Sequence, residues 1–173
     1  EQATGTRVLH GLAPGLHAVT VDHHANTTDS PEEAEEIRRQ IESLVGLPWV
    51  DPETHDATRG LTPGDFIVVA PYNAQVALIR EHLERAGLAD VPVGTVDKFQ
   101  GRQAPISIVS MTASNAGDSP HGARFLLSRN RLNVAISRGQ WAAIVVQART
   151  LTHYLPATPD GLETLGAFMA LTG

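Results

Sequence analysis

The chain has 173 residues, of which 42% are hydrophobic and 18% are charged, so it is long enough and apolar enough to form one domain with a substantial core. Its formal net charge of −6 excludes a protein that binds nucleic acid through overall positive charge, so any polyanion site must be a local patch of basic side chains. No run approaches the roughly 18 consecutive apolar residues of a membrane span, and no signal-peptide pattern is present. The chain has no cysteine, which excludes disulfides, and we expect a cytoplasmic protein.

Glycine and proline without periodicity mark the beginning of the chain, and we expect an arm over residues 1–18 that leads into a domain over residues 19–173. The first strand is predicted at residues 18–22. His23 and His24 follow it, and clustered histidines can hold a metal ion. No second ligand group with a recognised spacing follows them, so the sequence favours a polar loop and no metal site.

The next segment has the pattern of a capped helix. Ser30 can cap its start, a proline occupies the first helical position, and Glu33 stands where a capping box requires an acid. Apolar residues at helical spacing give this helix a core face, and Gly46 ends it. Residues 47–64 are rich in proline and glycine and are predicted to be a connecting loop, with Trp49 as a packing anchor.

A buried strand, a tight turn and a helix follow one another in the middle of the chain. Residues 66–70 are continuously apolar, residues 71–75 form the turn, and the helix ends at Gly87. Turns of this kind lie at the carboxyl edge of a parallel sheet, where ligands of α/β proteins bind. Asn73 is placed to cap the helix; the exposed amides beside it could receive a phosphate, although a plain cap is the favoured alternative.

Three further apolar runs predict strands, at residues 91–96, 106–111 and 142–146. Residues 112–124 are polar and are predicted to be a mobile loop, and a last helix is predicted near residues 162–169. Strands that alternate with helices predict an α/β fold with a mainly parallel sheet and helices on both faces.

Residues 131–139 predict a short helix with two arginines on one face. Arg131 and Arg138 are about 10 Å apart along such a helix, with small residues between them. Gly139 is predicted to end the helix in the left-handed conformation. Guanidinium groups stay ionised and match phosphate oxygens, so the face suits a polyanion; the alternative is a solvated face paired with carboxylates.

Three segments resemble motifs of superfamily 1 helicases in the order that this family shows. Residues 71–75 resemble motif IV, residues 94–102 resemble motif V, and residues 131–138 resemble motif VI. The resemblance runs from about residue 19 to residue 146 and is greatest for the branch that includes the nonsense-mediated-decay helicases and bacterial helicases fused to RecB-like nucleases. It implies that the domain is the second, C-terminal RecA-like lobe of such a helicase.

The resemblance also implies roles for single residues. Arg138 looks like the arginine finger that reaches the γ-phosphate, and Arg131 would support the same phosphates or fix the helix. The residues expected to face the nucleotide are Tyr72, Gln75, Gly101, Arg102 and Gln103. Those expected to contact nucleic acid are Asn73, Thr95 and Lys98.

Two positions depart from the family pattern. Gln103 stands where the family usually has a glutamate that bonds to the nucleotide sugar; its amide oxygen can still accept a hydrogen bond, but it carries no charge. Gly139 and Gln140 follow motif VI, where alanine and a basic residue are usual.

The chain has no phosphate-binding loop and no Asp-Glu pair that would hold Mg²⁺. The resemblance places both on the first RecA-like lobe, which would bind most of the ATP and its Mg²⁺. The expected partners are that lobe and single-stranded nucleic acid, with DNA favoured although nothing reads the 2′-hydroxyl; a fused nuclease domain is allowed, and no membrane partner is expected.

Two other functions are compatible with parts of the sequence. A catalytically silent RecA-like adaptor could bind nucleic acid or protein, but it would have no need of Arg131, Arg138 and Gln75. A flavodoxin-like enzyme would need a cofactor loop at a strand end, and no segment is rich enough in glycine or serine to supply one.

Overall fold

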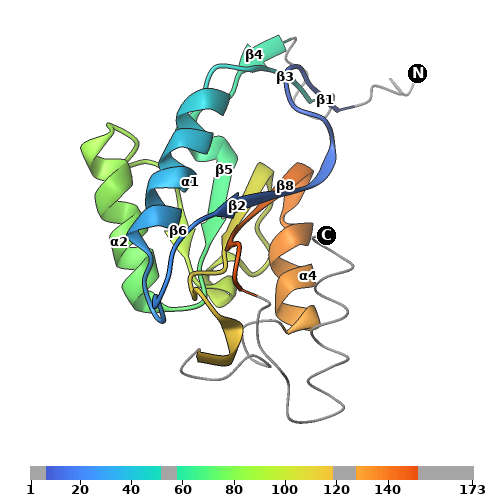
Figure 1. Ribbon diagram of the computed structural model, residues 1–173. Coiled ribbons are helices and arrows are strands. Elements are labelled where there is room, and N and C mark those ends of the chain that lie inside the picture. Colours follow the sequence, from blue (N-terminus) through green and yellow to red (C-terminus); the bar gives the residue numbers. More distant parts are fainter. Residues whose placement is uncertain (1–6, 52–57, 119–127, 152–173) are drawn as a thin grey trace.

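The fold is built on a five-stranded parallel sheet (Figure 1). The computed structural model describes residues 7–51, 58–118 and 128–151. The strands lie in the order β2-β8-β7-β5-β6, and every neighbouring pair is parallel. Their bounds are Gly15–Val21 for β2, Phe66–Val69 for β5, Val93–Gly94 for β6, Ala104–Ser110 for β7 and Gly139–Ala148 for β8.

Helices cover both faces of this sheet (Figure 1). Alternate side chains of each strand point to opposite faces, so each face carries side chains against which helices pack. Helices α1 (Pro31–Leu44) and α2 (Asn73–Arg85) share one core with Val68, Ile108 and Ile144. On the other face, α4 (Arg129–Ser137) and the 3₁₀ turn η3 (Val96–Phe99) share a second core. The sheet contributes to it the residues that directly follow Val68, Ile108 and Ile144 in their strands. This arrangement confirms the predicted α/β fold and is consistent with a RecA-like domain.

Residues 47–64 are not a plain loop. Strands β3 (Pro48–Val50) and β4 (Thr58–Gly60) pair antiparallel, and β1 (Val8–Leu9) pairs with β3. The 3₁₀ turn η2 (Pro63–Asp65) then leads into β5. Trp49 is 1% exposed and packs edge-to-face on Trp141, with ring centroids 6.4 Å apart, so its predicted role as an anchor is confirmed.

The N-terminal segment also holds more structure than predicted. Strand β1 lies within the expected arm, and β2 begins at Gly15 rather than at residue 18. Parallel pairing with β8 defines this earlier start, because Gly15 stands opposite Ala142. A two-residue strand has too few positions to show an alternating pattern, which explains why the sequence did not predict it.

The predicted helix ends are mostly confirmed. Ser30 is the N-cap of α1, and its hydroxyl accepts a bond from the Glu33 amide at 3.2 Å. Gly46 and Gly87 follow α1 and α2 with positive φ angles, as expected of C-terminal glycines. Asn73 is not a cap, however, because Tyr72 occupies the N-cap position of α2 and Asn73 is its first helical residue.

Gly139 does not have the predicted left-handed conformation. Arg138 is the C-cap of α4, with a φ of −72°, and Gly139 opens β8. A Cβ atom on Gly139 would lie 2.3 Å from the Ala142 carbonyl oxygen and 3.2 Å from the Ser107 amide nitrogen. A register shift between β7 and β8 brings these backbones together, so glycine is needed for close approach and not for its φ.

The described part of the predicted mobile loop is a loop over residues 112–115, but its burial contradicts the predicted mobility. Thr112, Ala113 and Ser114 are buried, and the 3₁₀ turn η4 (Ala116–Asp118) follows them. The remainder of that loop and the helix predicted near residues 162–169 lie outside the described residues. No helix of the described residues is long and apolar enough to cross a membrane.

The close approach at Gly139 predicts a specific cost for a methyl group. Gly139→Ala should lower the free energy of unfolding by about 1–3 kcal/mol, because the new atom meets backbone that cannot rotate away. Gly64→Ala is the matched control, since its Cβ would meet no atom closer than 3.8 Å and its stability should change little. Urea unfolding of both variants measures the difference; equal stabilities would contradict the packing described here.

Candidate nucleotide and nucleic-acid interface

Arg131 in α4 and Arg138 at its C-cap lie at opposite edges of the sheet. Arg131 lines a cavity at the carboxyl ends of β5 and β7, together with Val69 and Met111. Arg138 lies at the other end, where its carbonyl oxygen accepts a bond from the amide of Ala104, the first residue of β7, at 3.0 Å. The helix therefore spans the sheet from edge to edge. This arrangement favours the second role expected of Arg131, fixing the helix, over support of the phosphates that Arg138 would contact.

Buried hydrogen bonds hold the last turn of α4 in place. The hydroxyl of Ser107 on β7 donates to the Ala135 carbonyl at 2.7 Å, and the Arg138 amide donates to the same carbonyl at 3.3 Å. Ser107 is fully buried. The backbone from which the Arg138 side chain extends is thereby tied to the central strand of the sheet.

Arg138 carries an unsatisfied donor. Its side chain is partly exposed, but its Nε atom is buried and has no hydrogen-bond partner among the described residues. A guanidinium stays charged at any physiological pH, so a buried N–H without an acceptor is costly. The donor is suited to an anionic oxygen.

The turn of motif V joins the two edges of the sheet. Thr95 follows β6 at the carboxyl edge, whereas Ala104 begins β7 at the amino edge. Gly101, Arg102 and Gln103 lie between them and are exposed, immediately before the residue that bonds to Arg138. The structure therefore brings these three predicted nucleotide residues to the same edge as Arg138.

Tyr72 and Gln75 are placed differently from the expectation. Tyr72 lies beyond β5 at the carboxyl edge, and its ring is buried in the core beneath α4. Gln75 is fully buried: its side-chain oxygen accepts from the Ser30 amide at 2.7 Å, and its nitrogen donates to the hydroxyl of Ser110 at 3.2 Å. The prediction that Gln75 faces an open cleft is wrong, because the side chain replaces the acid expected to complete the cap of α1.

The expected nucleic-acid residues lie near the ends of adjacent strands. Asn73 and Thr95 follow β5 and β6, which are hydrogen-bonded to each other. Lys98 is exposed on η3, and its Nζ atom donates to the Val93 carbonyl at 2.9 Å. Burial, and then the nearby Arg80 and Arg102 charges, lower the pKa of Lys98.

The cavity at the carboxyl edge is too small for a nucleotide. It measures about 50 Å³, and it is lined by Thr95, Arg131 and apolar residues at the ends of β5 and β7. Small-molecule sites usually measure about 300–1,000 Å³. Within residues 7–51, 58–118 and 128–151, the carboxyl edge therefore offers surface contacts and no pocket of nucleotide size.

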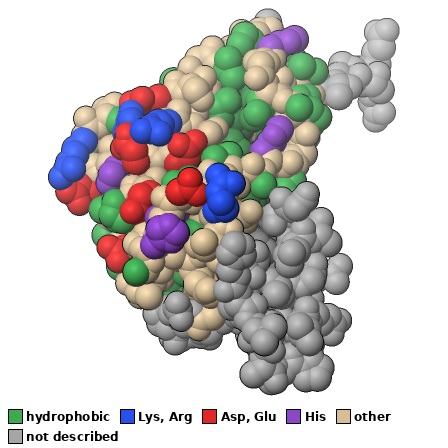
Figure 2. Space-filling view, viewed as in Figure 1, with side chains coloured by type: hydrophobic (Ala, Val, Ile, Leu, Met, Phe, Trp, Pro, Cys, Tyr) green, Lys and Arg blue, Asp and Glu red, His purple; other side chains and the backbone are tan. Residues whose placement is uncertain are grey.

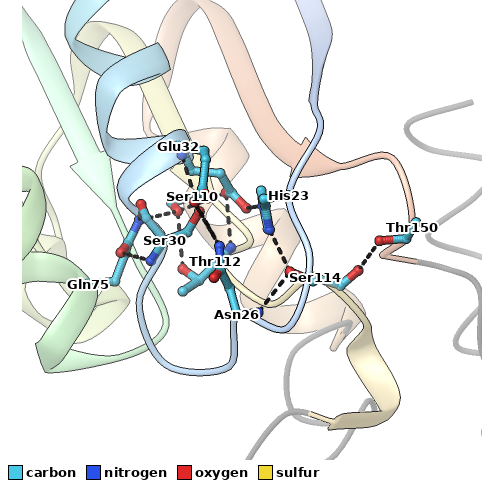
Figure 3. A network of polar contacts seen from close by, with 10 residues as sticks. His23, Asn26, Ser30, Glu32, Gln75, Ser110, Thr112, Ser114 and Thr150 are labelled. Carbon is cyan, nitrogen blue, oxygen red and sulfur yellow. Dashed lines mark hydrogen bonds and ion pairs between the residues drawn. The ribbon is translucent and has the colours of Figure 1, made fainter.

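A buried polar network that the sequence did not predict lies beneath this edge (Figure 3). His23 Nε2 is 2.6 Å from a Glu33 carboxylate oxygen, and both side chains are fully buried. The other Glu33 oxygen accepts bonds from the Ser110 hydroxyl and the Thr112 amide, each at 3.0 Å. His23 Nδ1 lies 2.6 Å from the Ser114 hydroxyl oxygen. His23 therefore lies in the loop that the sequence favoured, but its side chain is buried in this network.

The network ties three segments that are far apart in the sequence. Ser114 accepts a bond from the Asn26 amide at 2.9 Å, and its carbonyl accepts one from Thr150 at 2.7 Å (Figure 3). Polar residues at alternate positions, Ser110, Thr112 and Ser114, were the signal in the sequence, since they stand at the end of a mostly apolar strand and just beyond it. Within the described residues, no group of three or more His, Asp or Glu side chains could hold a metal ion.

The model of an AAA domain family, AAA_12, matches residues 17–150 of this sequence. The chain belongs to this family. It is 48% identical over 79 residues to DNA polymerase alpha-associated DNA helicase A of Schizosaccharomyces pombe, a match that covers 46% of this chain and 11% of the relative. It is 39% identical over 87 residues to DNA replication ATP-dependent helicase/nuclease DNA2 of Mus musculus, covering 50% of this chain and 8% of the relative.

A third relative carries the name of an RNA helicase. Human RNA helicase Mov10l1 is 35% identical over 95 residues, covering 53% of this chain and 8% of the relative. In each of these three matches the chain covers about a tenth of the relative's length. The family and the names of these relatives support a superfamily 1 helicase domain.

The buried Glu33 carboxylate predicts a large loss of stability when it is removed. Glu33→Ala should lower the free energy of unfolding by about 3–5 kcal/mol, because it leaves His23 and two donors buried without their acceptor. Glu42→Ala, which removes an exposed partner of Arg38, should cost about 1 kcal/mol or less. Urea unfolding of both variants tests this, and a loss at Glu33 no larger than that at Glu42 would show that the network adds little.

Proposed function

We propose that this domain is the second, C-terminal motor lobe of an ATP-dependent superfamily 1 helicase. The observation that carries the proposal is the path of motif V: one short segment joins Thr95 at the carboxyl edge to Ala104, whose amide is bonded to Arg138 at the amino edge. A nucleic-acid contact and a nucleotide contact would thus belong to one continuous piece of backbone. The helicase names of the relatives support the same assignment.

Arg138 would act as the arginine finger. Its buried and unpartnered Nε atom, with Arg102 and Gln103 exposed nearby in the fold, gives a donor set that fits an anionic nucleotide held mainly by another lobe with its Mg²⁺. When bound, ATP supplies the phosphoryl group that is transferred to water. The role of Arg138 is to stabilise negative charge on that group, and Gln103 would accept or donate a hydrogen bond without adding charge.

Asn73, Thr95 and Lys98 would contact the backbone of a single strand. These side chains offer hydroxyl, amide and ammonium groups, which bind phosphate oxygens without reading bases. Affinity for the strand should therefore fall with salt and depend little on its sequence. We propose DNA as the substrate and RNA as the alternative, since relatives are named for each.

Coupling between the nucleotide and the nucleic-acid strand follows from the positions of the two ends of motif V. Binding of the negatively charged phosphoryl group of ATP by Arg138 would draw this lobe toward its partner lobe, and loss of that group would release this lobe. Because the motif V backbone continues to Thr95, the same movement would displace the strand. A nuclease domain in the same protein is part of the proposal, as in the relative named helicase/nuclease DNA2.

Substitution of the finger tests the catalytic assignment. In the full-length protein, Arg138→Ala should lower the rate of ATP hydrolysis by about 10³–10⁵ and leave ATP binding nearly unchanged, because the finger acts on charge that develops in the transition state. Arg149→Ala is the control, since Arg149 is exposed and pairs with Asp22. Turnover within a few-fold of wild type would remove the assignment and favour an adaptor.

The isolated chain should not hydrolyse ATP. It has no phosphate-binding loop and no Asp-Glu pair for Mg²⁺, and phosphoryl transfer needs these parts assembled with the finger. Phosphate release by the purified 173-residue chain, with and without Mg²⁺ and single-stranded DNA, measures this directly. Metal-dependent turnover above the level of an Arg138→Ala variant would contradict the proposed division between two lobes.

A further inference from the structure

Three basic side chains gather around the edge strand β6. Arg80 on α2 and Lys98 on η3 both donate to the Val93 carbonyl oxygen, at 2.7 and 2.9 Å. That carbonyl points away from the sheet, because the carbonyls before and after it accept bonds from Val68 of β5 and from Ala70, the residue after β5. Arg102 follows η3 and lies close enough to Lys98 to lower the pKa of that lysine, after the larger effect of burial. We call Arg80, Lys98 and Arg102 the edge cluster.

The edge cluster is unusual in this molecule because its charges are not neutralised. Apart from Arg138 of motif VI, most other arginines of the described residues are paired with carboxylates, and acidic and basic groups are interspersed over α1 and α2 (Figure 2). The hydrogen bond from Arg38, for example, lowers the pKa of Glu35 to about 2. Across the described parts of the chain, no carboxylate forms an ion pair with any member of the edge cluster; the arginines that do have such partners are Arg7, Arg38, Arg39, Arg59, Arg85 and Arg149.

Protection of an exposed edge does not explain two cations on one carbonyl. A single lysine is enough to discourage another strand from pairing with an edge. Here Arg80 reaches the carbonyl from the helix layer on one face of the sheet, and Lys98 reaches it from η3 on the other face. Like charges that share one acceptor repel each other. An anion bound to both would relieve this repulsion.

The backbone is shaped to hold Lys98 in this position. A Cβ atom on Gly94 would lie 2.4 Å from the Lys98 Cδ atom, so the absence of a side chain there leaves room for the lysine to fold back along β6. Lys98 Nζ and Arg102 Cζ each lie 5.6 Å from the centre of the Phe99 ring, which is fully buried. A fixed aromatic ring therefore sets the positions of both cations before any ligand binds.

The surroundings of the edge cluster favour a single strand of nucleic acid over a small free anion. A hollow of about 310 Å³ beside β6 is lined by Arg80 and Lys98, but also by Glu84 and Asp90. A small anion within it would meet as many carboxylates as cations. A longer polyanion that also reaches Arg102, which does not line the hollow, would meet more positive than negative charge.

We propose that the edge cluster binds phosphates of the single strand that passes Thr95, so that the nucleic-acid track continues from the carboxyl edge around β6. This inference rests on the proposed helicase function and adds Arg80 to the residues that contact the strand. It also places Arg102, proposed above to lie near the nucleotide, within reach of that strand. Thr95 directly follows β6 and begins the turn that carries Lys98 and Arg102. One strand of nucleic acid can therefore pass from Thr95 to the edge cluster.

The salt dependence of binding tests the inference. In the full-length protein, anisotropy of a fluorescent oligo-dT measures affinity over a range of salt concentrations. Each phosphate contact to a single strand contributes about 0.7 to the slope of log K against log salt, so Arg80→Gln with Lys98→Gln should reduce the slope by about 1.4. The matched control is Arg39→Gln with Arg85→Gln, which removes the same charge from exposed, paired arginines and should leave the slope unchanged.

The outcomes separate this inference from the proposed function. If the wild-type protein hydrolyses ATP in the presence of oligo-dT but the edge-cluster variant keeps its salt slope, the inference is overturned and the helicase assignment stands. If the wild-type protein neither binds oligo-dT nor hydrolyses ATP, the helicase assignment itself fails. Displacement of oligo-dT from the wild-type protein by poly-glutamate, lost in the edge-cluster variant, would identify an acidic polypeptide as the occupant and overturn the inference.

Discussion

Parallel pairing of β6 and β7 with β5 is the constraint on which the rest of this structure depends. Strands that run in the same direction must be joined by a segment that returns from one edge of the sheet to the other. In this domain that segment is residues 95–103, the turn that resembles motif V. Its two ends are therefore at opposite edges for a topological reason. The same reason lets one segment contact two ligands that bind at different edges.

Helix α4 returns across the sheet in the same way and brings Arg138 beside the end of the motif V turn. Three features fix that meeting: the bond between the Ala104 amide and the Arg138 carbonyl, the Ser107 hydroxyl on the last turn of α4, and the close approach at Gly139. They are backbone and core interactions, so the guanidinium can remain unsatisfied while its attachment point is rigid. The buried Glu33 network has the corresponding effect at the carboxyl edge, where it immobilises the segments after β2 and β7.

Charge on this domain is arranged locally, as its acidic composition requires. Arg38 and Arg39 of α1 and Arg85 of α2 are neutralised by carboxylates within a turn or two of the same helices. Arg80, Lys98, Arg102 and Arg138, in contrast, have no carboxylate partner among the described residues. These four lie on or beside motifs V and VI or at the edge strand next to them. A protein of net negative charge can bind a polyanion when its few uncompensated cations lie together along one path.

Local sequence determined most of the main elements: apolar runs indicated the strands of the parallel sheet, Ser30 marked the start of α1, and motif order indicated the helicase family. It did not determine which polar groups meet. Gln75 and Ser30 are 45 residues apart, and His23 and Ser114 are 91 residues apart, so their contacts depend on strand order and register. The sequence could place Arg131 and Arg138 on one helix, but only the direction of that helix across the sheet decided that they reach opposite edges. Periodicity is a property of neighbouring residues, whereas the partner of a buried side chain is chosen by the packing of distant ones.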